Sequence, residues 1–192
     1  VTDIINSIVV LLNFVIIPGL SYGSQLALGA LGVTFVYAIL RFANFAHGEL
    51  MSFGAMITIL FTWFFQSQNI GLGILPTALI ALPFGILATI ILGLLSDKFV
   101  FKYYRKQKSV PVVLAMVSIG VMFVVNAIIR IIVGTETIKF SDGQKFIMKA
   151  KQFKMMTGLN EGLALKSSQV ITILITIALL SFTFWFLQKT KT

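Results

Sequence analysis

The sequence contains no cysteine, only one histidine and few charged residues. Of its 192 residues, 58% are hydrophobic and 11% are charged, whereas a soluble domain carries about a quarter charged residues. The lack of cysteine excludes a disulfide framework and a thiolate metal site. A single histidine, without an HExxH pair, argues against a membrane metalloenzyme. The composition therefore predicts an integral membrane protein, with no catalytic residue, metal site or cofactor expected.

The positive charge of the chain has two possible meanings. A net charge of +9 could indicate nucleic-acid binding, but the basic residues lie in short segments between apolar runs, a pattern that reports topology in membrane proteins. Neither GxSxG nor the phosphate-binding GxxxxGK[ST] occurs, so neither acyl transfer nor ATP hydrolysis is expected on this chain. We expect membrane lipid, and not nucleic acid, as its surroundings.

The length of the uncharged runs predicts an all-α, polytopic membrane protein in a single transmembrane domain, residues 1–192. A helix needs about 20 apolar residues to cross the hydrocarbon core. Divided at prolines, glycines and polar clusters, the runs predict six hydrophobic helices at about 4–17, 19–40, 50–66, 72–95, 109–133 and 167–188. The first is too short to cross alone, so it either continues past Pro18 or lies partly in the interface.

The distribution of lysine and arginine predicts the orientation. Residues 97–108 hold five basic residues and one acid, so we expect this loop to be cytoplasmic. The basic C-terminal end then lies on the same side. The loop at 134–166 must be external, although it carries six lysines against three acids.

The polar stretch RFANFAHGEL, residues 41–50, interrupts the apolar sequence and predicts a helix break. Asn44 is a good N-cap for the next helix, Glu49 would lie near its positive end, and Gly48 permits unusual backbone geometry in the break. Two interpretations are open at this point. The stretch is either an ordinary interfacial turn, or a discontinuous helix that lines a water-filled path.

The preceding helix carries a face of small residues and isolated polar groups. Gly19, Gly23 and Ala27 recur every four residues and would let another helix approach closely. Gln25 and Tyr37 place polar groups within the same apolar helix; they either join helices by hydrogen bonds or contribute to a pathway.

The residues from Gly19 to Gly54 resemble the permease subunits of bacterial ABC importers for branched-chain amino acids. Those proteins have a helix of the form GLxxGSxYALxAxGxTxVYG, followed by an NFAHGE signature. Residues 44–49 match the signature at every position, whereas Leu26 replaces an aromatic residue and Ala38 replaces a glycine. The resemblance implies a bacterial inner-membrane protein, not an enzyme, that forms part of a translocation path.

The resemblance also implies partners and candidate pathway residues. The partners would be a second homologous permease subunit, two cytoplasmic ATPases and a periplasmic or extracellular substrate-binding protein. Asn44, His47 and Glu49 would line or support the pathway, with Gln25 and Tyr37 behind them. Further transmembrane helices would follow the C-terminal end, so the chain is expected to be the N-terminal two-thirds of a permease. A urea or short-amide permease of the same family, and a non-transporting membrane scaffold, are the alternatives.

Overall fold

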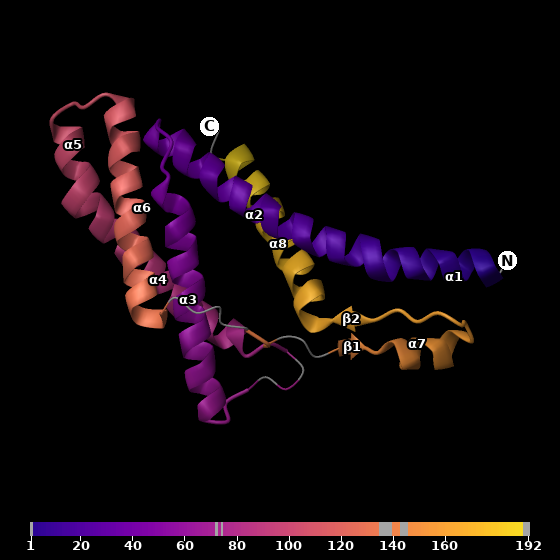
Figure 1. The fold of residues 1–192 in the computed structure, drawn as a ribbon. Helices are drawn as coiled ribbons and strands as arrows, with labels where there is room; N and C mark the ends of the chain where they lie inside the picture. The colour runs from indigo at the N-terminus through magenta and orange to yellow at the C-terminus, as the bar shows by residue number, and fades with distance from the viewer. Residues whose placement is uncertain (1, 72, 74, 135–139, 143–145, 190–192) are drawn as a thin grey trace. The chain divides into compact units, whose positions relative to one another are not determined.

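The computed structural model describes the chain except for residues 1, 72, 74, 135–139, 143–145 and 190–192 (Figure 1). The described part is predominantly helical and contains five helices that are long and apolar enough to cross a membrane. The all-α, polytopic fold is therefore confirmed. The count of six helices was approximate, because the first two expected helices form one.

The N-terminal helix runs without interruption from Thr2 to Leu40. It consists of α1 (Thr2–Leu11), a π-helical segment (Leu12–Ile16) and α2 (Ile17–Leu40). Pro18 was expected to divide two helices, because proline lacks an N–H and its ring crowds the preceding turn. The wider π-helical turn, in which the Ile17 N–H bonds to the Leu12 carbonyl, precedes the proline directly, and the helix continues through it.

The basic segment expected to be a loop is largely helical. The helix α4 (Ala78–Ser96) continues through a π-helical segment (Asp97–Phe101) into α5 (Lys102–Lys106). No glycine or proline occurs between Asp97 and Lys106, and Arg105 reaches back to form two hydrogen bonds of 2.6 and 2.7 Å with the Asp97 carboxylate. Both side chains are exposed, so the pair supports the helix only modestly.

The remaining spanning helices lie where they were expected, although the first of them begins four residues earlier than predicted. They are α3 (Ala46–Ser67), α6 (Pro111–Val133) and α8 (Ser167–Lys189). Pro111 occupies the first turn of α6, where its missing N–H costs nothing. The segment between α6 and α8 contains small elements that the hydrophobic pattern does not reveal: β1 (Phe146–Met148), α7 (Ala150–Thr157) and β2 (Leu165–Lys166), with β1 and β2 antiparallel.

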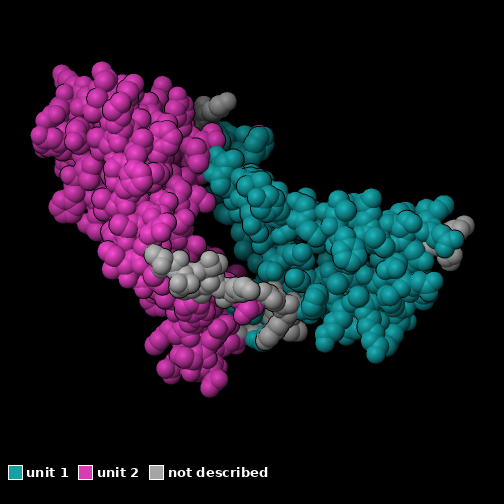
Figure 2. All heavy atoms as spheres, viewed as in Figure 1, with its two compact units in different colours: residues 1–31, 72–76, 142–192 teal, residues 32–71, 77–141 magenta. Residues whose placement is uncertain are grey.

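The chain divides into two compact units, coloured separately in Figure 2. Unit 1 comprises residues 1–31, 72–76 and 142–192, and unit 2 comprises residues 32–71 and 77–141. In unit 1, two asparagines seven residues apart on the N-terminal helix bind the chain that precedes β2. Asn6 Oδ1 accepts the Glu161 N–H at 3.4 Å, and Asn13 Oδ1 accepts the Ala164 N–H at 3.1 Å.

Unit 2 is built on the close packing of α3 against α4 and α6 (Figure 1). At the α3–α4 contact, Gly54 lies under the Thr89 hydroxyl and Gly85 lies under the Thr58 hydroxyl. Each threonine hydroxyl donates to the glycine carbonyl four residues earlier on its own helix, which satisfies the donor inside the helix pair. The adjoining core contains Phe42, Ala46, Phe101, Leu114, Val121 and Val125.

Candidate functional site

The break between α2 and α3 spans residues 41–45, a shorter stretch than the ten residues expected. Arg41 adopts the left-handed conformation, with φ of 60°, and its N–H donates to the Tyr37 carbonyl at 2.9 Å. This single bond and the left-handed residue form the αL motif that commonly ends a helix. The next residue, Phe42, is buried and packs its ring against Phe101, with ring centroids 5.7 Å apart.

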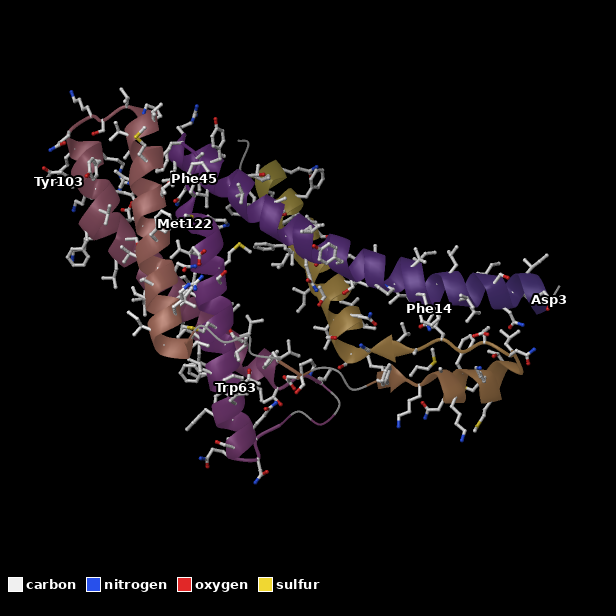
Figure 3. All side chains as sticks on the ribbon, viewed as in Figure 1. Asp3, Phe14, Phe45, Trp63, Tyr103 and Met122 are labelled. Carbon is white, nitrogen blue, oxygen red and sulfur yellow. The ribbon has the colours of Figure 1, made fainter. Side chains whose placement is uncertain are left out.

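Ser118 on α6 holds the break in place. Its fully buried hydroxyl accepts the Phe45 N–H at 3.0 Å and donates to the Ala115 carbonyl at 2.7 Å. Figure 3 shows Phe45 at the junction of α2 and α3. Ser118 lies seven residues inside α6, a distance of about 10 Å along the helix axis. The break therefore packs against the interior of α6 instead of lying level with the helix ends.

Asn44 accepts a hydrogen bond from the first turn of α3, much as expected. Asn44 Oδ1 accepts the N–H of Ala46, the first helical residue, at 3.1 Å, although Phe45 occupies the N-cap position itself. Because α3 begins at Ala46, Gly48 and Glu49 lie in its first turn. Gly48 is thus helical and does not form the break. Glu49 has the expected position near the positive end of the helix dipole.

Three of the five predicted pathway residues, Asn44, His47 and Tyr37, line one cavity of about 470 Å³. Tyr37 and Thr34 line it from α2, Asn44 from the break, and His47 and Gly48 from the start of α3. The rest of the lining is aliphatic or aromatic: Val33, Val36, Ala43 and Phe45. An apolar cavity with a few convergent polar groups is typical of a small-molecule site. We call it the tyrosine cavity.

His47 is packed tightly against α2. A methyl group on Gly32 would come within 2.9 Å of His47 Nε2, so the imidazole lies directly on the glycine backbone. Within the described part of the chain, Nε2 is buried and has no hydrogen-bond partner. Such atoms are uncommon, because an unpaired buried polar group destabilises the fold. Nε2 is therefore a buried hydrogen-bonding atom that the described residues leave unpaired.

Other predicted residues lie apart from the tyrosine cavity. Glu49 is half-buried on α3 but does not line it. Gln25 is exposed on the part of α2 that belongs to unit 1. Gly19, Gly23 and Ala27 are exposed as well, and no described atom lies within 4 Å of a methyl group placed on either glycine. The expected small-residue face is present on α2, but no described helix packs against it.

Sequence reasoning missed two residues that shape the site, Ser118 and Gly32. Each has a weak signal in the sequence: Ser118 is the one hydroxyl in the apolar helix α6, and Gly32 lies within a helix, where glycine is unfavourable. Their partners, Phe45 and His47, are known only from the packing. No group of three or more His, Asp or Glu residues that could hold a metal ion occurs within the described ranges.

Comparison with known families identifies the chain. Residues 15–192 match the family described as branched-chain amino acid transport system / permease component. The chain belongs to this permease family. No curated protein and no solved structure matches it. The permease is a multi-pass membrane protein, and large apolar side chains are exposed along each of the five spanning helices in the described part of the chain, as expected for helices that face lipid.

Proposed function

We propose that this chain is the membrane-spanning subunit of an ATP-driven importer and forms part of the translocation path for branched-chain amino acids. The observation that carries the proposal is the tyrosine cavity at the helix break, in a chain of this permease family. Irregular backbone inside a membrane protein is tolerated where it is buried or lines a cavity. The same arrangement occurs where transporters bind their substrates.

The chemistry of the cavity suits a small amphipathic solute. Val33, Val36 and Phe45 offer an apolar surface for a branched side chain, whereas Asn44 and His47 offer polar atoms for an amino or carboxyl group. Glu49 and Gln25, which lie outside the lining, remain proposed pathway residues that act from a distance or in another state of the transporter.

The exposed side of the tyrosine cavity supports a role for a second permease subunit. Tyr37 is 58% exposed and Phe45 is 53% exposed, although both line a site for solute. A homologous subunit packed there would close the path. ATP would be hydrolysed by two partner ATPases, and a substrate-binding protein would deliver the solute from outside.

The orientation follows from the charges on the described helices. The helix that ends in α5 carries four basic residues at that end, Lys98, Lys102, Arg105 and Lys106. We therefore assign this end, together with the C-terminal end of the chain, to the cytoplasmic side of a bacterial inner membrane. The segment 134–166 is then external. The break adjoins the basic end, because Phe42 in the break packs against Phe101.

Uptake by the complete transporter tests the proposal. Reconstituted with its ATPases and binding protein, the wild type should accumulate leucine when ATP is supplied. Tyr37→Ala should raise KM by about tenfold, as expected for the loss of contacts contributing about 1.4 kcal/mol. Tyr22→Ala is the matched control, because Tyr22 is exposed on the same helix outside the cavity.

The outcomes separate the alternatives. Uptake of urea or a short amide in preference to leucine would identify the other substrate class of the family. Assembly with the ATPases but no uptake of either solute would indicate a scaffold subunit. Equal effects of the two tyrosine substitutions would contradict a path at the helix break.

A further inference from the structure

A second cavity lies next to the tyrosine cavity within unit 2. Its volume is about 270 Å³, and it is bordered by Ala46 and Leu50 on α3, by Ser96 at the end of α4 and by Asp97 at the start of the π-helical segment. We call it the aspartate cavity. The two cavities share three lining residues, Val36, Asn44 and His47. These side chains therefore form the wall that separates one cavity from the other.

The helical geometry of α3 explains why His47 belongs to both cavities. Successive residues are rotated by about 100° around a helix. Ala46 and Leu50, four residues apart, therefore lie on one face and line the aspartate cavity, whereas Gly48 lies on another face and lines the tyrosine cavity. His47 lies between these faces, so its imidazole projects at the boundary.

The three shared residues differ in how firmly they are held. Asn44 is fixed by the hydrogen bond from the Ala46 N–H to its Oδ1, and breaking that bond would uncap the first turn of α3. Val36 is β-branched within a helix, where one rotamer dominates. The His47 imidazole rests on Gly32, and Nε2 has no hydrogen-bond partner among the described residues. Its rotation would break no hydrogen bond at Nε2.

We propose that His47 is a gate residue whose imidazole closes the passage between the tyrosine and aspartate cavities and swings aside to open it. The closed position is set by the contact with Gly32, since a glycine there leaves room for the ring. In the open position Nε2 can form a hydrogen bond with a polar group of the passing solute. The identity of that solute rests on the proposed function, and so does the closure of the exposed side of the tyrosine cavity by a second subunit, without which Thr34 is exposed.

The inference is tested by the accessibility of introduced cysteines, for which this cysteine-free sequence is a clean background. Thr34→Cys reports on the tyrosine cavity and Ser96→Cys on the aspartate cavity. A membrane-impermeant methanethiosulfonate is applied from the cytoplasmic side to the complete transporter in inverted vesicles. Ser96→Cys should react rapidly whether His47 or alanine is present at position 47. Thr34→Cys should react slowly with His47, and at least about tenfold faster with His47→Ala, because access would no longer depend on a minor open state.

Two further variants keep the test decisive. His47→Gln has a side chain long enough to close the passage, and it should leave the Thr34→Cys rate low. If His47→Ala does not assemble, Val36→Ala thins the same wall and should accelerate the reaction. Thr58→Cys is the control for loosened packing, because Thr58 lies at the α3–α4 contact and lines neither cavity.

Three results would overturn the gate. The first is fast labelling of Thr34→Cys while His47 is present, and the second is slow labelling of Thr34→Cys that neither His47→Ala nor Val36→Ala accelerates. The third is that His47→Ala accelerates the labelling of Thr58→Cys as much as that of Thr34→Cys. No substrate or ATP is needed for the labelling. A failed gate therefore leaves the transport proposal standing, and absent uptake with a working barrier contradicts only the proposed function.

Discussion

The imidazole of His47 on α3 lies against the backbone of Gly32 on α2, so closely that a methyl group on the glycine would come within 2.9 Å of Nε2. The contact joins the two helices on either side of the break at one point. It explains why a helix of good membrane length contains glycine there, although glycine lowers helix stability by about 1 kcal/mol relative to alanine.

Gly32→Ala should leave the protein less stable than Gly23→Ala by about 1 kcal/mol, because the added methyl group meets His47 Nε2 at 2.9 Å and the ring must move off α2 to admit it. The free energy of unfolding can be measured by denaturant titration in detergent micelles. Gly23→Ala on the same helix should be neutral or slightly stabilising, since nothing described lies within 4 Å of its new methyl group. The double variant Gly32→Ala/His47→Ala should recover part of the loss, and strict additivity of the two effects would contradict the contact.

Ser118→Ala should cost about 1–2 kcal/mol of unfolding free energy, because the Phe45 N–H loses its acceptor, the fully buried Ser118 hydroxyl. Thr183→Ala is a suitable control, since the Thr183 hydroxyl donates to the Leu180 carbonyl of its own helix, far from the break in sequence. Hydrogen exchange provides the specific measurement: the Phe45 amide should exchange faster in Ser118→Ala and remain unchanged in Thr183→Ala. Equal protection of Phe45 in both variants would show that Ser118 does not hold the break.

Gly54→Ala and Gly85→Ala should each destabilise unit 2 by about 1–3 kcal/mol, because each methyl group overlaps a threonine hydroxyl of the facing helix. Gly120→Ala, inside α6 with no neighbour within 4 Å, is the matched control and should be neutral or stabilising. Thermal unfolding in detergent compares the three. A melting temperature as high as that of the control in both Gly54→Ala and Gly85→Ala would contradict the close approach of α3 and α4.

Labelling from one side of the membrane tests the topology. A cysteine at Gln107, directly after α5, should react with an impermeant reagent only from the cytoplasmic side. A cysteine at Met156, which is 83% exposed on α7, should react only from outside. Reaction of both positions from the same side would overturn the assignment of segment 134–166 to the exterior.

The sequence predicted the helices best where uncharged runs ended at strong signals. The expected helices 109–133 and 167–188 correspond to α6 and α8 within two residues at each end, because the length of an apolar run is a direct physical requirement of the bilayer. The sequence predicted the ends of helices poorly where a helix continues beyond the expected boundary. Pro18 does not end the N-terminal helix, since the π-helical turn before it accommodates the ring, and the basic residues after Ser96 remain helical.

Some features of the candidate site could likewise be predicted from the sequence, and others could not. The sequence alone determined that the chain is a polytopic membrane protein with a break after Leu40, that Asn44 would support the next helix, and that the stretch 44–49 carries the signature of the permease family. These features depend on composition and on neighbours along the chain. That Gly32 supports His47, that Ser118 holds Phe45, and that His47 separates two cavities was decided only by tertiary structure. Such contacts join residues far apart in the sequence, and hydrophobic periodicity records which face of a helix is apolar, not which residue packs against it.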